Sequence, residues 1–228
     1  DLNLQLGIKK TIAVFKFENL SGKKEDDHLC SAISLDIRNE LNKIGKLNVK
    51  ARRFTFNKNP NDLDLDYYID GYIDAPLSET GGSRNIVVSI VNARSETYEW
   101  TGQFKYNDKE ILTIQDTIIK SILTKLEIDP IGNEITSSTD IYKSQENFKL
   151  IGEGILNFDN KNYPAAKKAF DSVLESDPEN IVALYHKANT YFEQNKYDDA
   201  MNIYKDILGQ SGTINPVDVR WPYPIRND

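Results

Sequence analysis

The stretch NFKLIGEGILNFDNKNYPAAKKAFDSVLESDPEN, residues 147–180, is followed directly by IVALYHKANTYFEQNKYDDAMNIYKDILGQ, residues 181–210. At an offset of 34 residues, leucine falls on leucine, small residues fall on small residues, and aromatic residues fall on aromatic residues. The matched positions are Leu150 with Leu184, Gly154 with Ala188, Phe158 with Phe192, Tyr163 with Tyr197, Ala166 with Ala200, Phe170 with Tyr204, Val173 with Ile207 and Leu174 with Leu208. This period predicts two stacked helical hairpins. Asp177-Pro178 separates them, because proline cannot continue a helix.

Length and pattern together resemble the tetratricopeptide repeat over residues 145–212. The resemblance implies an all-α protein-binding scaffold, in which the first helix of each pair lines a concave groove. The residues expected in that groove are Ile151, Ile155, Phe158, Asp159, Tyr185, Asn189, Phe192 and Glu193. An alternative is equally open at this point: these side chains contact the neighbouring domain or the tail of the chain instead of a partner.

Two such repeats do not bury their apolar faces unaided, and about three are needed for stability. The segment that caps them is the preceding domain, the tail at 213–228, a partner chain, or further repeats beyond Asp228. The tail carries three prolines and is expected to be extended. Trp221 and Tyr223 in this tail are candidates to fill the groove.

The first half of the chain predicts a different fold, with short β-branched and aromatic runs and two amphipathic helical patterns. Strands are expected at 11–17, 47–51, 67–73, 85–91 and 98–104, and helices at 29–44 and 111–126. Residues 18–22 are expected to form the turn that ends the first strand, 57–66 a loop, and 78–84 a turn between antiparallel strands. The order β-α-β-β-β-β-α favours an α/β (α+β) domain with both helices on one face of a mixed sheet. Boundaries are expected to give an α/β domain at 1–136, the repeats at 137–212 and the tail at 213–228.

Several segments of this half resemble, in order, the domains similar to the amino-terminal domain of TolB. They are Ile12–Gly22 (IAVFKFENLSG), Leu47–Phe56 (LNVKARRFTF), Asp66–Ile73 (DYYIDGYI), Tyr98–Trp100 (YEW) and Ile111–Asp116 (ILTIQD). In bacteria such domains accompany class III adenylate or guanylate cyclases and CadC-like membrane-bound transcriptional regulators. The chain departs from the family pattern in one place, because only an Asn/Asp-rich loop stands where the family has a helix between its second and third strands.

Charge and composition exclude several classes of function. The net charge is −7, which opposes binding to a phosphate backbone. The densest basic run, Lys50-Ala51-Arg52-Arg53, is interpreted as a solvated strand end, so no nucleic acid is expected as a partner. A single cysteine, Cys30, excludes a disulfide within the chain. No apolar window is long enough to span a bilayer. The chain begins at Asp1, which favours a processed product or a piece of a longer protein.

No catalytic, cofactor or metal site is expected. His28 and Cys30 lie two residues apart on one helix and point in different directions, so they do not form a nucleophile pair. The acidic run Asp62–Asp66 lacks the glycine and the glutamate that an EF-hand loop needs. A candidate ligand loop remains at the carboxyl end of the first strand: Glu18, Asn19, Ser21 and Gly22. Its alternative is a structural turn.

The sequence thus favours a non-catalytic regulatory or sensory binding region of a larger bacterial signalling protein, acting through a protein or peptide partner. A homo-oligomer is allowed. The periplasmic side of a membrane-anchored protein is favoured, with the cytoplasm left open. The alternative function is a stand-alone scaffold or envelope assembly factor that uses the repeats alone.

Overall fold

The computed structural model describes residues 9–24, 26–52, 55, 57–74, 84–107, 109–129 and 136–210. The predicted tail at 213–228, with Trp221 and Tyr223, lies outside the described residues, as does most of the predicted turn at 78–84. The elements, in chain order, are β1 (Lys10–Val14), β2 (Glu18–Leu20), α2 (Asp26–Lys43), β3 (Leu47–Val49), the 3-10 helix η2 (Pro60–Asp62), β4 (Tyr67–Asp74), β5 (Arg84–Asn92), β6 (Thr97–Tyr106), α3 (Ile111–Lys125), α4 (Ser138–Tyr142), α5 (Gln145–Asp159), α6 (Tyr163–Ser176), α7 (Ile181–Glu193) and α8 (Tyr197–Gln210).

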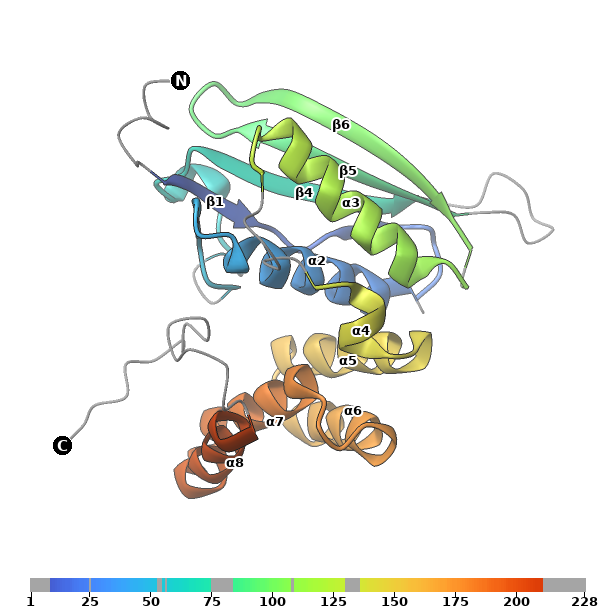
Figure 1. Cartoon of the computed structure of the whole chain (residues 1–228), viewed down its shortest axis with the longest axis vertical. Helices are drawn as coiled ribbons and strands as arrows, with labels where there is room; N and C mark the ends of the chain where they lie inside the picture. Colours follow the sequence, from blue (N-terminus) through green and yellow to red (C-terminus); the bar gives the residue numbers. More distant parts are fainter. Residues whose placement is uncertain are drawn as a thin grey trace.

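The first half forms a mixed sheet with the strand order β3-β1-β4-β5-β6, and β2 lies beside β4. β1 pairs in parallel with β3 and β4, whereas β4, β5 and β6 are antiparallel. The helices α2 and α3 lie against one face of this sheet (Figure 1). Alternate residues of the strands, such as Ile69, Ile86 and Ile90, form the core beneath these helices. The predicted mixed sheet with two amphipathic helices is confirmed.

The first strand is interrupted, and here the sequence-based prediction is wrong. We expected one strand at 11–17 and a turn at 18–22, but β1 ends at Val14 and Glu18–Leu20 form β2. Val14 pairs with Ile69 and Glu18 with Tyr72, so four steps along one strand match three steps along β4. The extra residue makes the break a bulge. Within it, the Phe17 amide donates to the Ser34 hydroxyl of α2 at 2.8 Å.

Between β3 and β4, the described residues form 3-10 turns, including η2, and no α-helix, so the departure from the TolB-like pattern is present in the described part of the chain. The Asn59 side chain accepts a hydrogen bond from the Asn61 amide and begins η2. Asp66, the last residue of the acidic run, accepts from the Thr11 amide and pairs with Arg94. These contacts give the carboxylate of Asp66 a structural role between neighbouring strands.

The helices α5 to α8 form two antiparallel hairpins, as the 34-residue period predicts. Close packing explains the small residues of the pattern, since a Cβ at Gly154 would lie 2.3 Å from the Phe170 ring. Each first helix has a side-chain cap: Ser144 accepts from the Asn147 amide, and Asn180 accepts from the Ala183 amide. The all-helical second segment is therefore confirmed.

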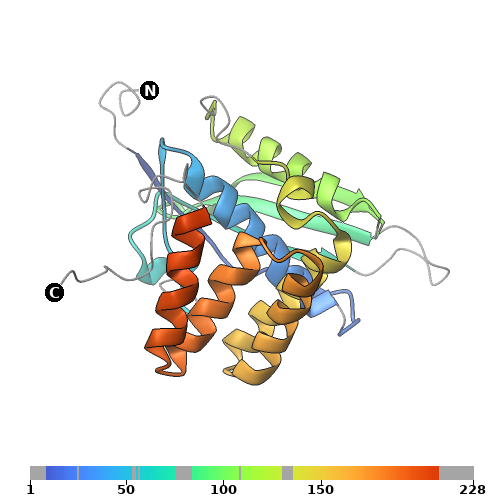
Figure 2. The same ribbon diagram turned by 60° about the horizontal axis from the view of Figure 1, so that its bottom comes forward.

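The first repeat is docked on the α/β domain through α2. α5 packs along α2, and the remaining helices extend outward to α8 (Figures 1 and 2). The approach is closest at Gly152, where a Cβ would lie 2.0 Å from the His28 carbonyl oxygen. The segment leading into α4 is also fixed, because Ser138 donates to buried Asp36 at 2.7 Å and the Thr136 amide donates to Glu40 at 2.9 Å. The two halves therefore share one continuous core.

Candidate functional site: a cleft between the sheet and the repeats

The predicted groove residues of the first repeat lie against the α/β domain. Ile151 and Ile155 are buried and belong to the core that α5 shares with α2. Phe158 is partly buried and makes an edge-to-face contact with Tyr163, with 5.8 Å between the ring centroids. Asp159 forms an ion pair with Arg52 from the segment after β3. The first repeat thus has its concave face covered by this chain's own residues.

The predicted residues of the second repeat line a cavity. Tyr185, Asn189, Phe192 and Glu193 face α2 and residues 49–52 across a space of about 210 Å³. Asn189 is held in place by the Tyr204 hydroxyl, which donates to its side-chain oxygen at 2.6 Å. The structure therefore brings the second half of the predicted groove together as a partly open surface. Whether a partner binds there stays a prediction.

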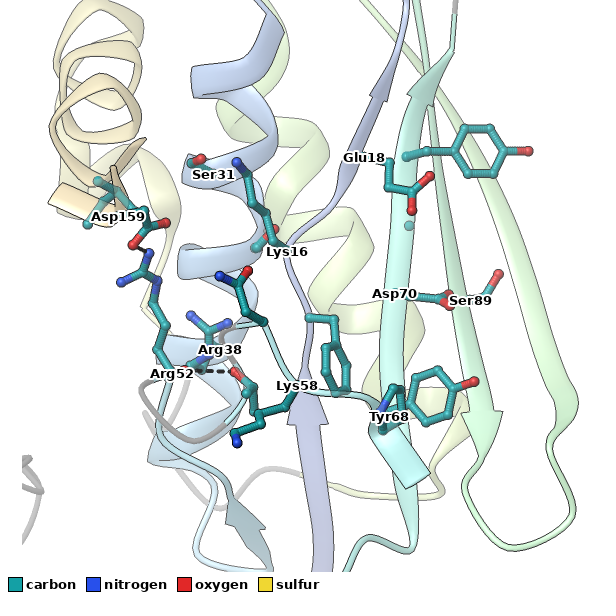
Figure 3. Close-up of a pocket in the computed structure, with 18 of the residues that line it drawn as sticks. Lys16, Glu18, Ser31, Arg38, Arg52, Lys58, Tyr68, Asp70, Ser89 and Asp159 are labelled. Carbon is teal, nitrogen blue, oxygen red and sulfur yellow. Dashed lines mark hydrogen bonds and ion pairs between the residues drawn. The ribbon is translucent and has the colours of Figure 1, made fainter. Parts of the chain in front are cut away.

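A larger cleft, of about 480 Å³, lies at the carboxyl ends of β1 and β3 (Figure 3). One side is formed by α2, the end of α5 and the segment after β3, and the other side by the sheet. Open α/β sheets commonly bind ligands at a position of this kind, because the strand order reverses there: the chain goes from β1 to β3 on one side, and then from β3 to β4 on the other side of β1. Phe15 and Tyr68 form an aromatic part of its wall, with ring centroids 5.7 Å apart.

Two arginines lie between this cleft and the smaller cavity, and both line both spaces. Arg38 on α2 is only 7% exposed, and it donates from Nη2 to the Val14 carbonyl at the end of β1. Burial lowers the pKa of Arg38 to about 9, and Arg52 acts in the same direction. Burial alone lowers the pKa of Arg52 to about 10. The interpretation of Arg52 as a solvated strand end is wrong, because its guanidinium is largely covered and pairs with Asp159.

Carboxylates line the opposite side of the larger cleft. Glu18 and Asp70 come from β2 and β4, and Figure 3 shows them on the side of the sheet, across from Arg38 and Arg52. Burial raises the pKa of Asp70, and the negative charge of Glu18 raises it further. The cleft thus has Arg38, Arg52 and Asp159 on the helix side and Glu18 and Asp70 on the sheet side, and Lys16, which follows β1, lines it as well.

The predicted ligand loop is divided by the structure. Glu18 faces the cleft, but Asn19 and Ser21 are engaged within the loop and with α2. Asn19 donates to Asp27 at 2.7 Å, and the Ser21 hydroxyl makes a 2.6 Å contact with Asp26. Gly22 has a φ of +76°, a value that favours glycine. These contacts describe a well-satisfied start of α2, and a ligand role for the loop stays a prediction.

Two further titratable side chains near these spaces, Cys30 and His186, are held in their neutral forms. Burial, then Asp26, raises the pKa of the Cys30 thiol to about 12, so the thiolate is not formed at neutral pH. Burial, then Arg52 and Arg38, lowers the pKa of His186 to about 3, which leaves a neutral imidazole. In the described part of the chain, no group of three His, Cys, Asp or Glu residues is placed to hold a metal ion. None of the described helices is long and apolar enough to cross a membrane.

The sequence-based prediction did not include Arg38. A signal for Arg38 was present, because α2 carries Cys30, Ser31, Ala32 and Ser34 beside its apolar stripe. Small residues around a helix indicate contacts on a second face. The sequence predicts Gly152 to serve close packing of a repeat helix, and the structure confirms this, but the sequence does not show that the partner is the His28 carbonyl of the other domain.

Comparisons with known proteins agree with this two-part organisation. A tetratricopeptide repeat family profile matches residues 157–213, which confirms the repeats. The putative adenylate cyclase 3 of Rhizobium meliloti (strain 1021) is 25% identical over 187 residues, which are 76% of this chain and 31% of that protein. The chain therefore spans about a third of the length of this curated relative.

Solved structures similar to part of the chain include three bacterial proteins. TolB from Acinetobacter baumannii has a TM-score of 0.39 and 14% identity, covering 54% of this chain and 29% of that one. PelC from Paraburkholderia phytofirmans, a dodecamer, has a TM-score of 0.38 and 12% identity, covering 53% and 90%. The lipoprotein GNA1162 from Neisseria meningitidis has a TM-score of 0.35 and 9% identity, covering 52% and 98%. TolB, which the sequence resembles, is thus among the similar structures.

Proposed function

We propose that this chain is the non-catalytic regulatory region of a larger signalling protein of the cyclase or membrane-bound regulator kind, and that it acts through a protein or peptide partner. The distant similarity to a putative adenylate cyclase supports the kind of parent protein. The observation that carries the proposal is the docking of α5 on α2, which makes the repeats and the α/β domain one packed unit. A partner that binds to one part therefore also affects the other part through this packing.

The surface left for that partner is on the second repeat. Tyr197 and Met201 of α8 are 54% and 42% exposed, and Ile181 at the start of α7 is 41% exposed. Repeat arrays extend by packing another helix on such an end, so an apolar face there favours a helical or extended partner segment. The partly open cavity lined by Tyr185 and Phe192 adjoins the same repeat.

The test uses the full-length gene product that contains this chain. Cyclic nucleotide formation, or promoter activation for a DNA-binding parent, is measured in cells for the wild type and for Tyr197→Ser with Met201→Ser. We expect the double variant to lose the regulated part of the activity and to keep the basal part. The matched control is Leu20→Ser, which removes an exposed apolar side chain of β2, outside the repeats, and should change nothing. Equal regulation in all three proteins contradicts the proposal.

A second function, a stand-alone scaffold, is favoured by the same apolar end of α8, because a partner could bind it without any output domain. The two functions differ in what the gene encodes beyond this chain. A full-length product without a cyclase or DNA-binding domain, whose partner is released by the double variant, supports the scaffold.

A further inference from the structure

The charge of Arg38 has no carboxylate partner among the described residues. Its one hydrogen bond is made by Nη2 to the Val14 carbonyl, and its Nε is buried without a partner in the described structure. A buried charge without a counterion costs several kcal/mol, so proteins pair such groups or use them to hold ligands. The neighbouring Arg52 has its own partner in Asp159.

Other cations lie near the Arg38 guanidinium, which lines the cleft although the residue is only 7% exposed. Arg52 lies close enough to lower the pKa of Arg38, and Lys58 lines the same cleft. Ser31 and Ser34 add hydroxyl groups along the same side of α2. The cleft is open to solvent-sized molecules, with a volume of about 480 Å³ that is typical of a metabolite site. An anionic group that enters it finds a preformed guanidinium, which suits carboxylate geometry.

The opposite wall restricts the class of ligand. Glu18 and Asp70 would repel a second negative charge and would accept hydrogen bonds from an ammonium group. Between the two charged sides, Phe15 and Tyr68 provide an aromatic wall for a short apolar portion. The described lining of the cleft carries four cations, Arg38, Arg52, Lys16 and Lys58, and three carboxylates, Glu18, Asp70 and Asp159. A molecule with one charge of each sign therefore fits this mixed lining better than a polyanion such as phosphate.

We propose that the cleft binds a small zwitterion of the amino-acid type, with its carboxylate on Arg38 and its ammonium group toward Glu18 and Asp70. The site lies beside α2, the helix that also holds the first repeat. Binding would therefore be an input to this unit that is separate from the partner surface on the second repeat. Binding of an amino acid to this cleft can be tested on the chain itself, without knowledge of the parent protein.

The experiment measures thermal unfolding of the purified chain with each of the twenty common amino acids at about 10 mM, and with inorganic phosphate. A ligand present at a hundred times its Kd stabilises a protein by RT ln(1 + [L]/Kd), which is readily detected. We expect at least one amino acid to raise the Tm. The matching amine, which lacks the carboxylate, should give no shift, and phosphate should give none.

Variants then assign the two ends of the ligand by calorimetric titration. Arg38→Met should weaken binding of the amino acid by about tenfold to a hundredfold, as for a lost charge-assisted hydrogen bond. Glu18→Gln, at an exposed position that the fold tolerates, should weaken binding of the amino acid but not of the same molecule without its amino group. Lys120→Met on the exposed face of α3 is the matched control and should bind like the wild type.

Each other outcome overturns the proposal. Stabilisation by phosphate and by no amino acid would show a different anion site. Stabilisation by the amine alone would show that Arg38 does not hold the ligand. The absence of any shift in the whole panel would show that the cleft is not an amino-acid site. If Arg38→Met does not fold, Glu18→Gln still tests the proposed orientation. The orientation is refuted if Glu18→Gln binds the amino acid, and the same molecule without its amino group, as tightly as the wild type does.

Discussion

The close approach of α5 to α2 can be tested by adding one methyl group. In Gly152→Ala the new Cβ would lie 2.0 Å from the His28 carbonyl oxygen and 3.0 Å from the Ala32 side chain. Because the first contact is with backbone, one helix must move away from the other. Overpacking of this kind costs about 1–3 kcal/mol. Alanine in place of glycine inside a helix returns about 0.8–1.0 kcal/mol. The difference is a net loss of about 0–2 kcal/mol, and because the obstacle is rigid backbone we expect the upper half of this range, about 1–2 kcal/mol.

Gly209→Ala is the matched control, since it changes the same residue type in α8, where nothing lies within 4 Å of the added Cβ. It should gain up to about 1 kcal/mol from helix propensity. For a chain of this size, 1 kcal/mol corresponds to about 2–4 °C in Tm. Calorimetry should therefore show Gly152→Ala melting about 2–8 °C below the wild type, with Gly209→Ala slightly above it. If Gly152→Ala is as stable as Gly209→Ala, the docking of the repeats on α2 is refuted.

Three further predictions concern single buried groups. Burial raises the pKa of Asp36 to about 7, so the folded protein holds this proton more tightly than the unfolded chain, and stability should fall as the pH rises from about 4 to 7. Asp36→Asn should remove this dependence and raise the free energy of unfolding at pH 8 by at most about 4 kcal/mol. Urea denaturation at pH 5 and pH 8 measures this free energy for both proteins. A variant that is destabilised equally at both pH values contradicts the prediction. Asn180→Ala should lower the free energy of unfolding by about 1–3 kcal/mol, because it removes the cap of α7 and the 3.1 Å hydrogen bond to the Ile141 carbonyl. Hydrogen exchange should show faster opening of α7 and α8. Unchanged exchange in these two helices would refute the prediction. Cys30 should resist iodoacetamide at pH 8 in the native protein and react in denaturant, and rapid native labelling would show that its burial is wrong.

Local periodicity explains which parts of the fold were predictable. The repeats follow from residue spacing alone, because each small or aromatic position serves contacts within 34 residues along the chain. The two amphipathic helices and the antiparallel strands follow for the same reason. The bulge after Val14 does not, since it depends on how Phe17 meets Ser34 on a helix that comes later in the chain. The alternation of apolar and polar residues along a strand does not show at which residue a bulge shifts the pairing register.

The cleft was predicted only in part, because the residues that line it come together from distant parts of the chain. Glu18 was found because the end of the first strand is a known place for ligands in such sheets. Arg52 was assigned to solvent, because a basic run after a strand looks exposed when Asp159 is not known to be near it. Arg38 follows Ile37 on a helix, where a charged residue normally marks the solvent side. In the structure the Arg38 side chain reaches the Val14 carbonyl of β1 and lies between the sheet and the repeats, which a helical pattern alone does not show.

This docking also answers how two repeats are stable where about three are normally needed. The capping surface is α2, whose residues from Leu29 to Arg38 are buried almost without interruption because the sheet covers one side and α5 the other. Each half therefore completes the core of the other: Ile151 and Ile155 would be exposed without α2, and the small-residue side of α2 would be exposed without α5. A helix shared in this way cannot shift against one neighbour without disturbing its contacts with the other. Arg38 lies on that same helix and lines both the larger cleft and the cavity beside the second repeat, so these two spaces share one wall.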